Sequence, residues 1–172
     1  MKSALYTRRG DDGTSLLYGT TVRIPKDDAV IEALGAVDEL NSLLGVCRTV
    51  LPADARALIA HVQNRLFTLQ AEIAGAHPTI TSSHVSEIET DIADIEAVIT
   101  VPHSFVIPGA MFESAMLDYA RTVARRAERS LVRSKVGKAQ GIAYLNRLSS
   151  LLYVLARHAA ENSHAPEARP SY

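Results

Sequence analysis

The sequence has a single cysteine, almost no net charge and no long apolar run, and each shortage excludes a class of protein. One cysteine, Cys47, cannot form a disulfide within the chain. Its place in an apolar helical pattern indicates a small core residue rather than a reactive thiol. A formal net charge of -1 gives no overall attraction to nucleic acid or to an anionic membrane. Any charge-driven binding must therefore come from a local cluster.

Segments that would direct the chain into or across a membrane are also missing from the sequence. No stretch reaches the roughly 18 consecutive apolar residues that a membrane span needs. The first residues, Met1–Tyr6, lack the apolar core of a signal peptide. We therefore expect a cytoplasmic protein that binds neither membranes nor nucleic acid.

Several common catalytic patterns are absent as well. The six histidines have no metal-ligand spacing, and there is no nucleophile elbow or Cys/His pattern. The glycine-bearing run Gly10–Ser15 lacks the Gly-Lys-Ser/Thr of a Walker A motif. We expect no metal cage built from protein side chains, although a magnesium ion held mainly by phosphate oxygens needs few protein ligands.

What the sequence does contain is enough apolar material for one helical domain. Its 172 residues, of which 47% are hydrophobic, can build a single core. Residues 1–28 lack helical periodicity and carry three of the nine glycines, which predicts a loop or an extended arm. Beyond them, apolar residues recur at steps of three and four, which is typical of helices. The expected helices cover residues 29–49, 54–75, 82–99, 111–136 and 142–163.

Five helices joined by short loops predict an all-α, five-helix bundle in one domain over residues 1–172. Asp27 or Asp28 can cap the start of the first helix. The bundle is expected over residues 29–163, and the tail at 164–172 is expected to fray.

The fourth expected helix carries a cluster of five arginines: Arg121, Arg125, Arg126, Arg129 and Arg133. Three of them are spaced four apart and share one helix face, where like charges repel unless an anion or an acidic surface lies opposite. The guanidinium group suits phosphate and carboxylate oxygens. For the cluster alone, a solvated face or salt bridges to another helix is the more common interpretation, and Asp118 and Glu128 can pair with some of the arginines.

Four smaller features accompany the cluster. The Gly-Asp-Asp-Gly run at residues 10–13 can turn backbone N–H groups toward an anion, although a simple turn is the commoner outcome. Asp38 lies near the edge of a buried stripe, where a carboxylate favours a cationic partner, or else it is an exposed surface acid. Phe105 lies in a loop bracketed by prolines and can either enter a ligand pocket or cover the core. Asn146 falls between apolar positions and can face a polar site.

Several segments occur together in the order of one known family. They are Tyr6–Gly13, Pro25–Asp28, Glu32–Ser42, Gln63–Phe67, Phe105–Gly109, Ala120–Arg129 and Tyr144–Ser149. The most specific part is Arg-Arg-Ala-Glu-Arg on a helix, followed downstream by Tyr-Leu-Asn-Arg-Leu-Ser. In these segments, which span nearly the whole chain, the sequence resembles the PduO-type ATP:cob(I)alamin (corrinoid) adenosyltransferases. It departs from the family pattern at Arg9, Val30, Ala110 and Ser150.

The resemblance implies an enzyme that transfers the 5′-deoxyadenosyl group of ATP to cob(I)alamin, forming adenosylcobalamin and triphosphate. It implies Mg²⁺ as a cofactor, a cobalamin or related corrinoid as substrate, and a homotrimer with active sites at subunit interfaces. A reductase and an adenosylcobalamin-dependent enzyme are the further partners that such an activity suggests. The bundle would carry a non-helical N-terminal loop that binds ATP.

The resemblance also implies roles for individual residues. The catalytic set is Phe105 beneath the corrin ring, Arg125 at the triphosphate, and an Arg121–Asp38 pair across the subunit boundary. The residues implied in nucleotide binding are Thr7, Arg8, Arg9, Gly10, Gly13, Ser15, Lys26, Arg125, Arg126, Glu128, Arg129 and Asn146.

Two other functions remain open at this point. One is a non-catalytic trimer of the same fold that delivers or senses ATP or adenosylcobalamin. The other is a helical interaction protein whose arginines bind acidic partners. Adenosyl transfer distinguishes the enzyme from the first, and ATP binding distinguishes it from the second.

Overall fold

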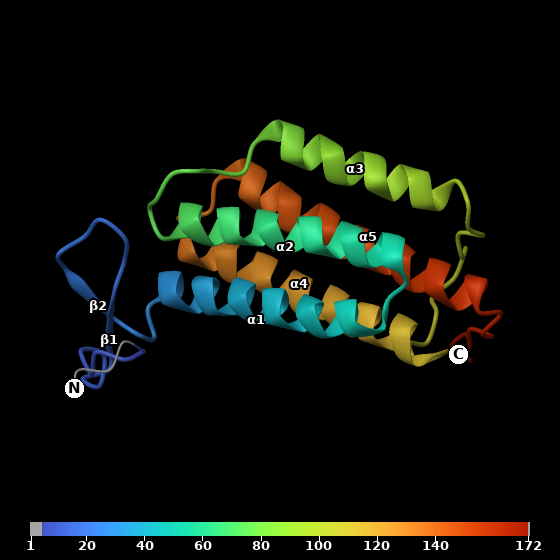
Figure 1. Ribbon diagram of the computed structural model, residues 1–172, viewed down its shortest axis with the longest axis horizontal. Coiled ribbons are helices and arrows are strands. Elements are labelled where there is room, and N and C mark those ends of the chain that lie inside the picture. Colours follow the sequence, from blue (N-terminus) through green and yellow to red (C-terminus); the bar gives the residue numbers. More distant parts are fainter. Residues whose placement is uncertain (1–4, 172) are drawn as a thin grey trace.

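A short β-hairpin precedes five helices in the computed structural model, which describes residues 5–171 (Figure 1). The first four residues of the expected arm and the last residue of the expected tail lie outside this range. The elements are β1 (Thr14–Leu16), β2 (Arg23–Pro25), α1 (Ala29–Val50), α2 (Ala53–Ile73), α3 (Ser82–Glu96), α4 (Phe112–Ser134) and α5 (Ala139–Asn162). The predicted all-α five-helix bundle is confirmed, while the hairpin within the arm was not predicted.

Local chemistry explains where the helices begin and end. Asp28 is the N-cap of α1, and its Oδ1 accepts a hydrogen bond of 2.8 Å from the backbone N–H of Val30. Pro52 separates α1 from α2. Gly75 follows α2 with a φ of 87°, a left-handed conformation that glycine adopts without a steric penalty. These boundaries lie within two residues of those expected from the sequence.

The start of α5 differs from the expectation. The expected helix begins at residue 142, but α5 begins earlier, at Ala139, and includes Gly141, which is buried within its first turn. A Cβ atom at this position would lie 2.8 Å from Cδ1 of Leu69 on α2. The glycine therefore allows a close approach of α5 to α2 and does not end a helix.

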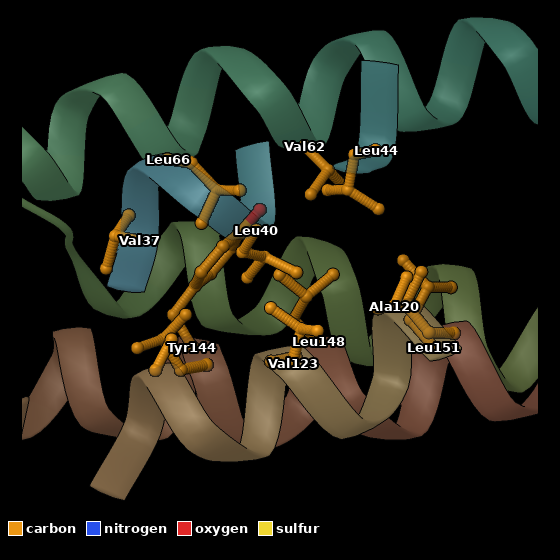
Figure 2. Packing of buried hydrophobic residues seen from close by; sticks show 14 of the residues in the cluster. Val37, Leu40, Leu44, Val62, Leu66, Ala120, Val123, Tyr144, Leu148 and Leu151 are labelled. Atoms are coloured by element: carbon orange, nitrogen blue, oxygen red, sulfur yellow. The ribbon is translucent and has the colours of Figure 1, made fainter. Parts of the chain in front are cut away.

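The core fills the space between the helices (Figure 2). The helix α4 packs against both α1 and α5, while α2 covers α1 and α3 covers α5. Leucines such as Leu40, Leu66 and Leu148 point into this space from three different helices and are fully buried. Cys47 is also fully buried, as its position in the apolar pattern predicted.

The two ends of the bundle carry different loops (Figure 1). The hairpin lies beyond the end at which α1 begins and α4 finishes. The loop at residues 97–111 lies at the opposite end, near the C-terminus. Because α4 has 23 residues, these ends are separated by roughly 35 Å along its axis.

The C-terminal tail differs from the frayed segment that the sequence suggested. Glu167 forms an ion pair with Arg157 of α5, and the carbonyl oxygen of Ala168 accepts a hydrogen bond of 2.9 Å from the N–H of Ile107. These contacts hold the tail against the loop at 97–111. Across residues 5–171, none of the helices is both long and apolar enough to cross a bilayer.

Candidate functional site

Side chains of α4 and α5 form a basic hollow on the side of the bundle. Arg125, Glu128, Arg129 and Val132 of α4, with Asn146 of α5, line an open depression of about 290 Å³. Asn146 Nδ2 donates a hydrogen bond of 3.1 Å to Glu128 Oε1. The structure thus brings together four residues that were predicted to share one nucleotide site. We call this depression the arginine groove.

Two arginines of the groove are available to an anion. Arg129 Nη1 donates to the backbone carbonyl oxygen of Arg125, at 3.1 Å. Within residues 5–171, no carboxylate lies at ion-pair distance from either Arg125 or Arg129. Two exposed guanidinium groups one helical turn apart repel each other, and a polyanion between them would relieve this repulsion.

Two other arginines of the cluster have acidic partners. Arg126 forms an ion pair with Glu39 of α1, and Arg121 Nε lies 3.2 Å from Asp118 Oδ1 on its own helix. The interpretation of the arginine cluster as ordinary salt bridges therefore applies to Arg121 and Arg126. It does not apply to the two arginines of the groove.

Asp38 and Arg121 are not brought together within the chain. Asp38 is exposed on α1, and its Oδ1 accepts a hydrogen bond of 3.3 Å from Gln70 Nε2. The implied pairing of these residues is one between subunits, so it stays a prediction.

The N-terminal arm folds around its glycines. The N–H of Gly13 donates to the carbonyl oxygen of Gly10 at 3.2 Å, and Gly13 has a φ of 78°. Lys26 donates from Nζ to the carbonyl oxygen of Gly10 at 2.8 Å and from its backbone N–H to Gly13 at 2.8 Å. Ser15 lies on β1 opposite Ile24 of β2. The predicted arm residues Gly10, Gly13 and Lys26 thus form one turn.

Arg23 is a structural residue of this turn that sequence reasoning missed. Its guanidinium donates to Thr14 Oγ1 at 2.6 Å, to the carbonyl oxygen of Arg9 at 2.6 Å and to that of Thr14 at 2.9 Å. Arg23 lies on β2 opposite Leu16 of β1, and its role becomes visible only with this hairpin register. Arg23 holds the two sides of the arm together.

A second anchor of the turn is Asp12. Its Oδ1 accepts hydrogen bonds from the side chain of Thr14 at 2.7 Å and from the backbone N–H of Thr14 at 3.0 Å. These bonds lower the pKa of the Asp12 carboxyl. Thr7, Arg8 and Arg9 lie on the exposed outer part of the arm, with the Arg8 guanidinium carbon 5.5 Å from the centre of the Tyr6 ring.

The loop at 97–111, which contains Phe105, lies at the other end of the bundle (Figure 1). The Phe105 side chain is 76% exposed and does not cover the core. A side chain this exposed contributes little to the core. The exposure excludes the core-covering alternative for Phe105, and its contact with a ligand stays a prediction.

The acidic residues of the described chain do not gather around a metal position. In the part of the chain that the structure describes, no group of three or more His, Cys, Asp or Glu side chains is arranged to hold a metal ion. Glu128 is the carboxylate that lines the arginine groove. It could complement phosphate oxygens around a magnesium ion, which needs few protein ligands.

Comparisons with known proteins agree on one group of relatives. The sequence profile of the family described as cobalamin adenosyltransferase matches residues 5–159. The corrinoid adenosyltransferase PduO of Salmonella typhimurium is 40% identical over 96% of this chain, which spans only 52% of that protein. The cobalamin adenosyltransferase of Cupriavidus metallidurans is 40% identical, with 90% of this chain and 87% of the relative covered.

A solved structure shows the same fold. It is that of a variant PduO-type ATP:corrinoid adenosyltransferase from Lactobacillus reuteri, complexed with cobalamin and ATP. It superposes with a TM-score of 0.89 at 25% sequence identity, covering 96% of each chain.

Proposed function

Because the chain belongs to the cobalamin adenosyltransferase family, we propose that it transfers the 5′-deoxyadenosyl group of ATP to the cobalt of a reduced corrinoid. The electron pair of Co(I) attacks the 5′-carbon of the ribose. A cobalt–carbon bond forms, and the bond from that carbon to the triphosphate oxygen breaks. The leaving triphosphate takes the electron pair of the broken bond, so no general base is needed.

The observation that carries this proposal is the pair of uncompensated arginines in the arginine groove. Negative charge builds up on the triphosphate as the bond breaks, and fixed guanidinium groups stabilise that charge without reorganising. Arg125 and Arg129 are already free of carboxylate partners within residues 5–171, so no internal ion pair has to break when ATP binds. Asn146 and Glu128 form a hydrogen bond with each other and also line the arginine groove.

Mg²⁺ would be held mainly by the phosphate oxygens, with Glu128 as a nearby carboxylate. When bound, it would neutralise part of the triphosphate charge. The arm would add the N–H groups of its glycine turn and the Lys26 ammonium group. Both are groups that favour a phosphate.

Features of the single chain support a homotrimer whose active sites lie between subunits. No hydrogen bond or ion pair of the described residues joins residues 6–26 to α4 or α5. The exposed side chains of Phe112 and Tyr119, seven residues apart, also leave an apolar stripe on α4. A neighbouring copy could cover this stripe and bring its arm to the arginine groove. The same neighbour would pair its Asp38 with Arg121.

The remaining partners follow from the chemistry. Co(I) forms only under strong reduction, so a reductase must supply the electron, and an adenosylcobalamin-dependent enzyme would use the product. A cytoplasmic location remains a prediction from the sequence.

The test is turnover. The protein, ATP, Mg²⁺ and chemically reduced cobalamin are mixed without oxygen, and the visible spectrum is followed as the cobalt–carbon bond forms. We expect conversion to adenosylcobalamin with release of triphosphate. ATP binding in a calorimeter without conversion would instead support a delivery or sensor protein. No ATP binding would support a protein that binds acidic partners.

A further inference from the structure

A buried ion pair lies beside the Phe105 loop and has no role in the transfer proposed above. Asp118 of α4 is 2% exposed and Arg157 of α5 is 3% exposed. Arg157 Nη2 donates to Asp118 Oδ2. Such a pair adds little net stability, because removing both charges from water offsets most of their attraction. The role of the pair therefore lies in the segments that it holds in place.

Arg157 also contacts the C-terminal tail. Its Nε lies 3.0 Å from Glu167 Oε1, at ion-pair distance but without the alignment of a hydrogen bond. The Tyr153 ring centre lies 4.9 Å from the guanidinium carbon of Arg157. Arg157 is thus fixed by Asp118 and Tyr153 and presents its remaining side to the tail.

The tail in turn holds the loop at 97–111. Ala168, the neighbour of Glu167, accepts a hydrogen bond of 2.9 Å from the N–H of Ile107. Ile107 is two residues beyond Phe105. The route from the buried Asp118 to the exposed Phe105 therefore passes through Arg157, Glu167–Ala168 and Ile107.

A second carboxylate holds the other side of the loop. Thr100 donates to Glu161 of α5 from its backbone N–H at 2.9 Å and from its hydroxyl at 3.0 Å. Between the two attachments lies an open hollow of about 290 Å³, lined by Pro102, His103 and Val106 of the loop among others. Since this hollow separates part of the loop from the core, the loop depends on its attachments for its position.

We infer that Arg157 and Glu167 are positioning residues for the corrinoid. They act through the tail and Ile107 to hold Phe105 in a fixed position at the end of the bundle. This inference rests on the proposed function for its substrate. A projecting aromatic ring has no core packing of its own. If its loop moves by about 1 Å, the ring loses its alignment with a flat ligand, and such misplacements slow enzymes strongly.

The test compares Glu167→Gln with a matched control. Glu167→Gln keeps the size of the side chain and removes its charge, so the fold should be retained. The control is Glu87→Gln, which removes the ion pair of 2.9 Å to Arg65 on the surface of α2 and α3, away from the loop. Steady-state kinetics are measured separately for cobalamin and for ATP.

We expect Glu167→Gln to lower kcat/KM for reduced cobalamin roughly five- to tenfold, the range expected for the loss of one typical polar contact. The KM for ATP and the melting temperature should be unchanged. Glu161→Gln should also lower kcat/KM for cobalamin, through Thr100. Glu87→Gln should change the kinetics for neither substrate. Equal losses for ATP and cobalamin, or no loss in Glu167→Gln, would overturn the inference.

Hydrogen exchange separates this inference from the proposed function. The amide of Ile107 is protected by Ala168, so peptides covering residues 101–111 should exchange faster in Glu167→Gln than in the unmodified chain or in Glu87→Gln. This readout needs no turnover. If the unmodified chain transferred no adenosyl group, the proposed function would fail, while faster loop exchange would still support the attachment. Unchanged exchange would refute the attachment whether or not the enzyme is active.

Discussion

The two ends of the helical bundle present opposite chemistries, each with its own means of support. The end at which α1 begins carries a polar hairpin arm, held internally by Arg23, Lys26 and backbone hydrogen bonds. The other end carries an exposed aromatic ring on a loop held by carboxylates of α5 and the tail. One end suits a polyanion and the other suits a flat apolar face. In the proposed function, the arm and Phe105 of one protomer are therefore separated by roughly 35 Å of helix.

With this separation, the proposed function needs more than one chain to complete an active site. The arginine groove lies on the side of α4 and α5, with no hydrogen bond or ion pair to residues 6–26 among the residues described. Assembly of several copies would let the arm of one subunit meet the groove of another. The following substitutions test whether the two ends act on different substrates.

The largest effect is expected from Arg125→Ala in the groove. Loss of one fixed donor to the leaving triphosphate should lower kcat/KM for ATP roughly 100- to 1000-fold. Stability should be retained, because the Arg125 side chain is exposed. Arg133→Ala, an exposed arginine two turns further along α4, serves as the control and should change ATP kinetics little. Near-normal ATP kinetics in Arg125→Ala would remove the groove from the mechanism.

The next largest effect is expected from Phe105→Ala at the opposite end. We expect turnover to fall roughly 10- to 100-fold, about 1.4 kcal/mol of activation free energy per tenfold. The KM for ATP should be unchanged. The melting temperature should also be unchanged, since the ring is 76% exposed and fills no core space. A large drop in the melting temperature would show that Phe105 supports the fold instead.

A smaller effect is expected from Gly13→Ala in the arm. A side chain at the observed φ of 78° is strained by about 1 kcal/mol, so ATP binding measured by calorimetry should weaken roughly fivefold. Cobalamin kinetics at saturating ATP should be unaffected. Gly45→Ala is the matched control, because Gly45 lies inside α1, where a Cβ meets only the Gln63 amide at 3.6 Å. This control should raise the free energy of unfolding by about 0.5–1 kcal/mol without changing ATP affinity.

The smallest effect on activity is expected in the core between the two ends, where the prediction concerns stability. Burial raises the pKa of the Cys47 thiol to about 11 from its usual 9.0. The folded state therefore favours the protonated thiol more than the unfolded state does, and this part of the stability is full below pH 9. It is lost as the pH rises toward 11. The free energy of unfolding, measured with urea at increasing pH, should fall more steeply above pH 9 in the unmodified chain than in Cys47→Ala. Equal slopes in the two proteins would contradict this prediction.

The sequence predicted the parts of the molecule that are encoded by helical periodicity. The five helices follow apolar spacing, and Arg125, Glu128 and Arg129 share one face of a helix by arithmetic alone. Asn146 joins them because α5 packs against α4. The family resemblance, now supported by relatives at 40% identity, supplied the substrates that spacing could not.

The parts that escaped prediction depend on tertiary contacts or on short elements. The strands β1 and β2 have three residues each, too few for apolar alternation to show. The role of Arg23 requires the register of this hairpin. The attachment of the tail joins Arg157 to Glu167 and Ile107 to Ala168, and no periodic pattern marks either pair. In the sequence alone Gly141 resembles a helix breaker, because its close approach to Leu69 is visible only in the folded chain.

The most direct test of the account is complementation between subunits. Lys26→Ala in the arm and Arg125→Ala in the groove are each expected to be nearly inactive alone. When the two variants are unfolded, mixed equally and refolded together, about a quarter of the interface sites in a cyclic assembly should combine an intact arm with an intact groove. Recovery of roughly that fraction of the unmodified activity is the predicted result. No recovery from a mixture shown to contain both variants in one oligomer would contradict a site shared between subunits.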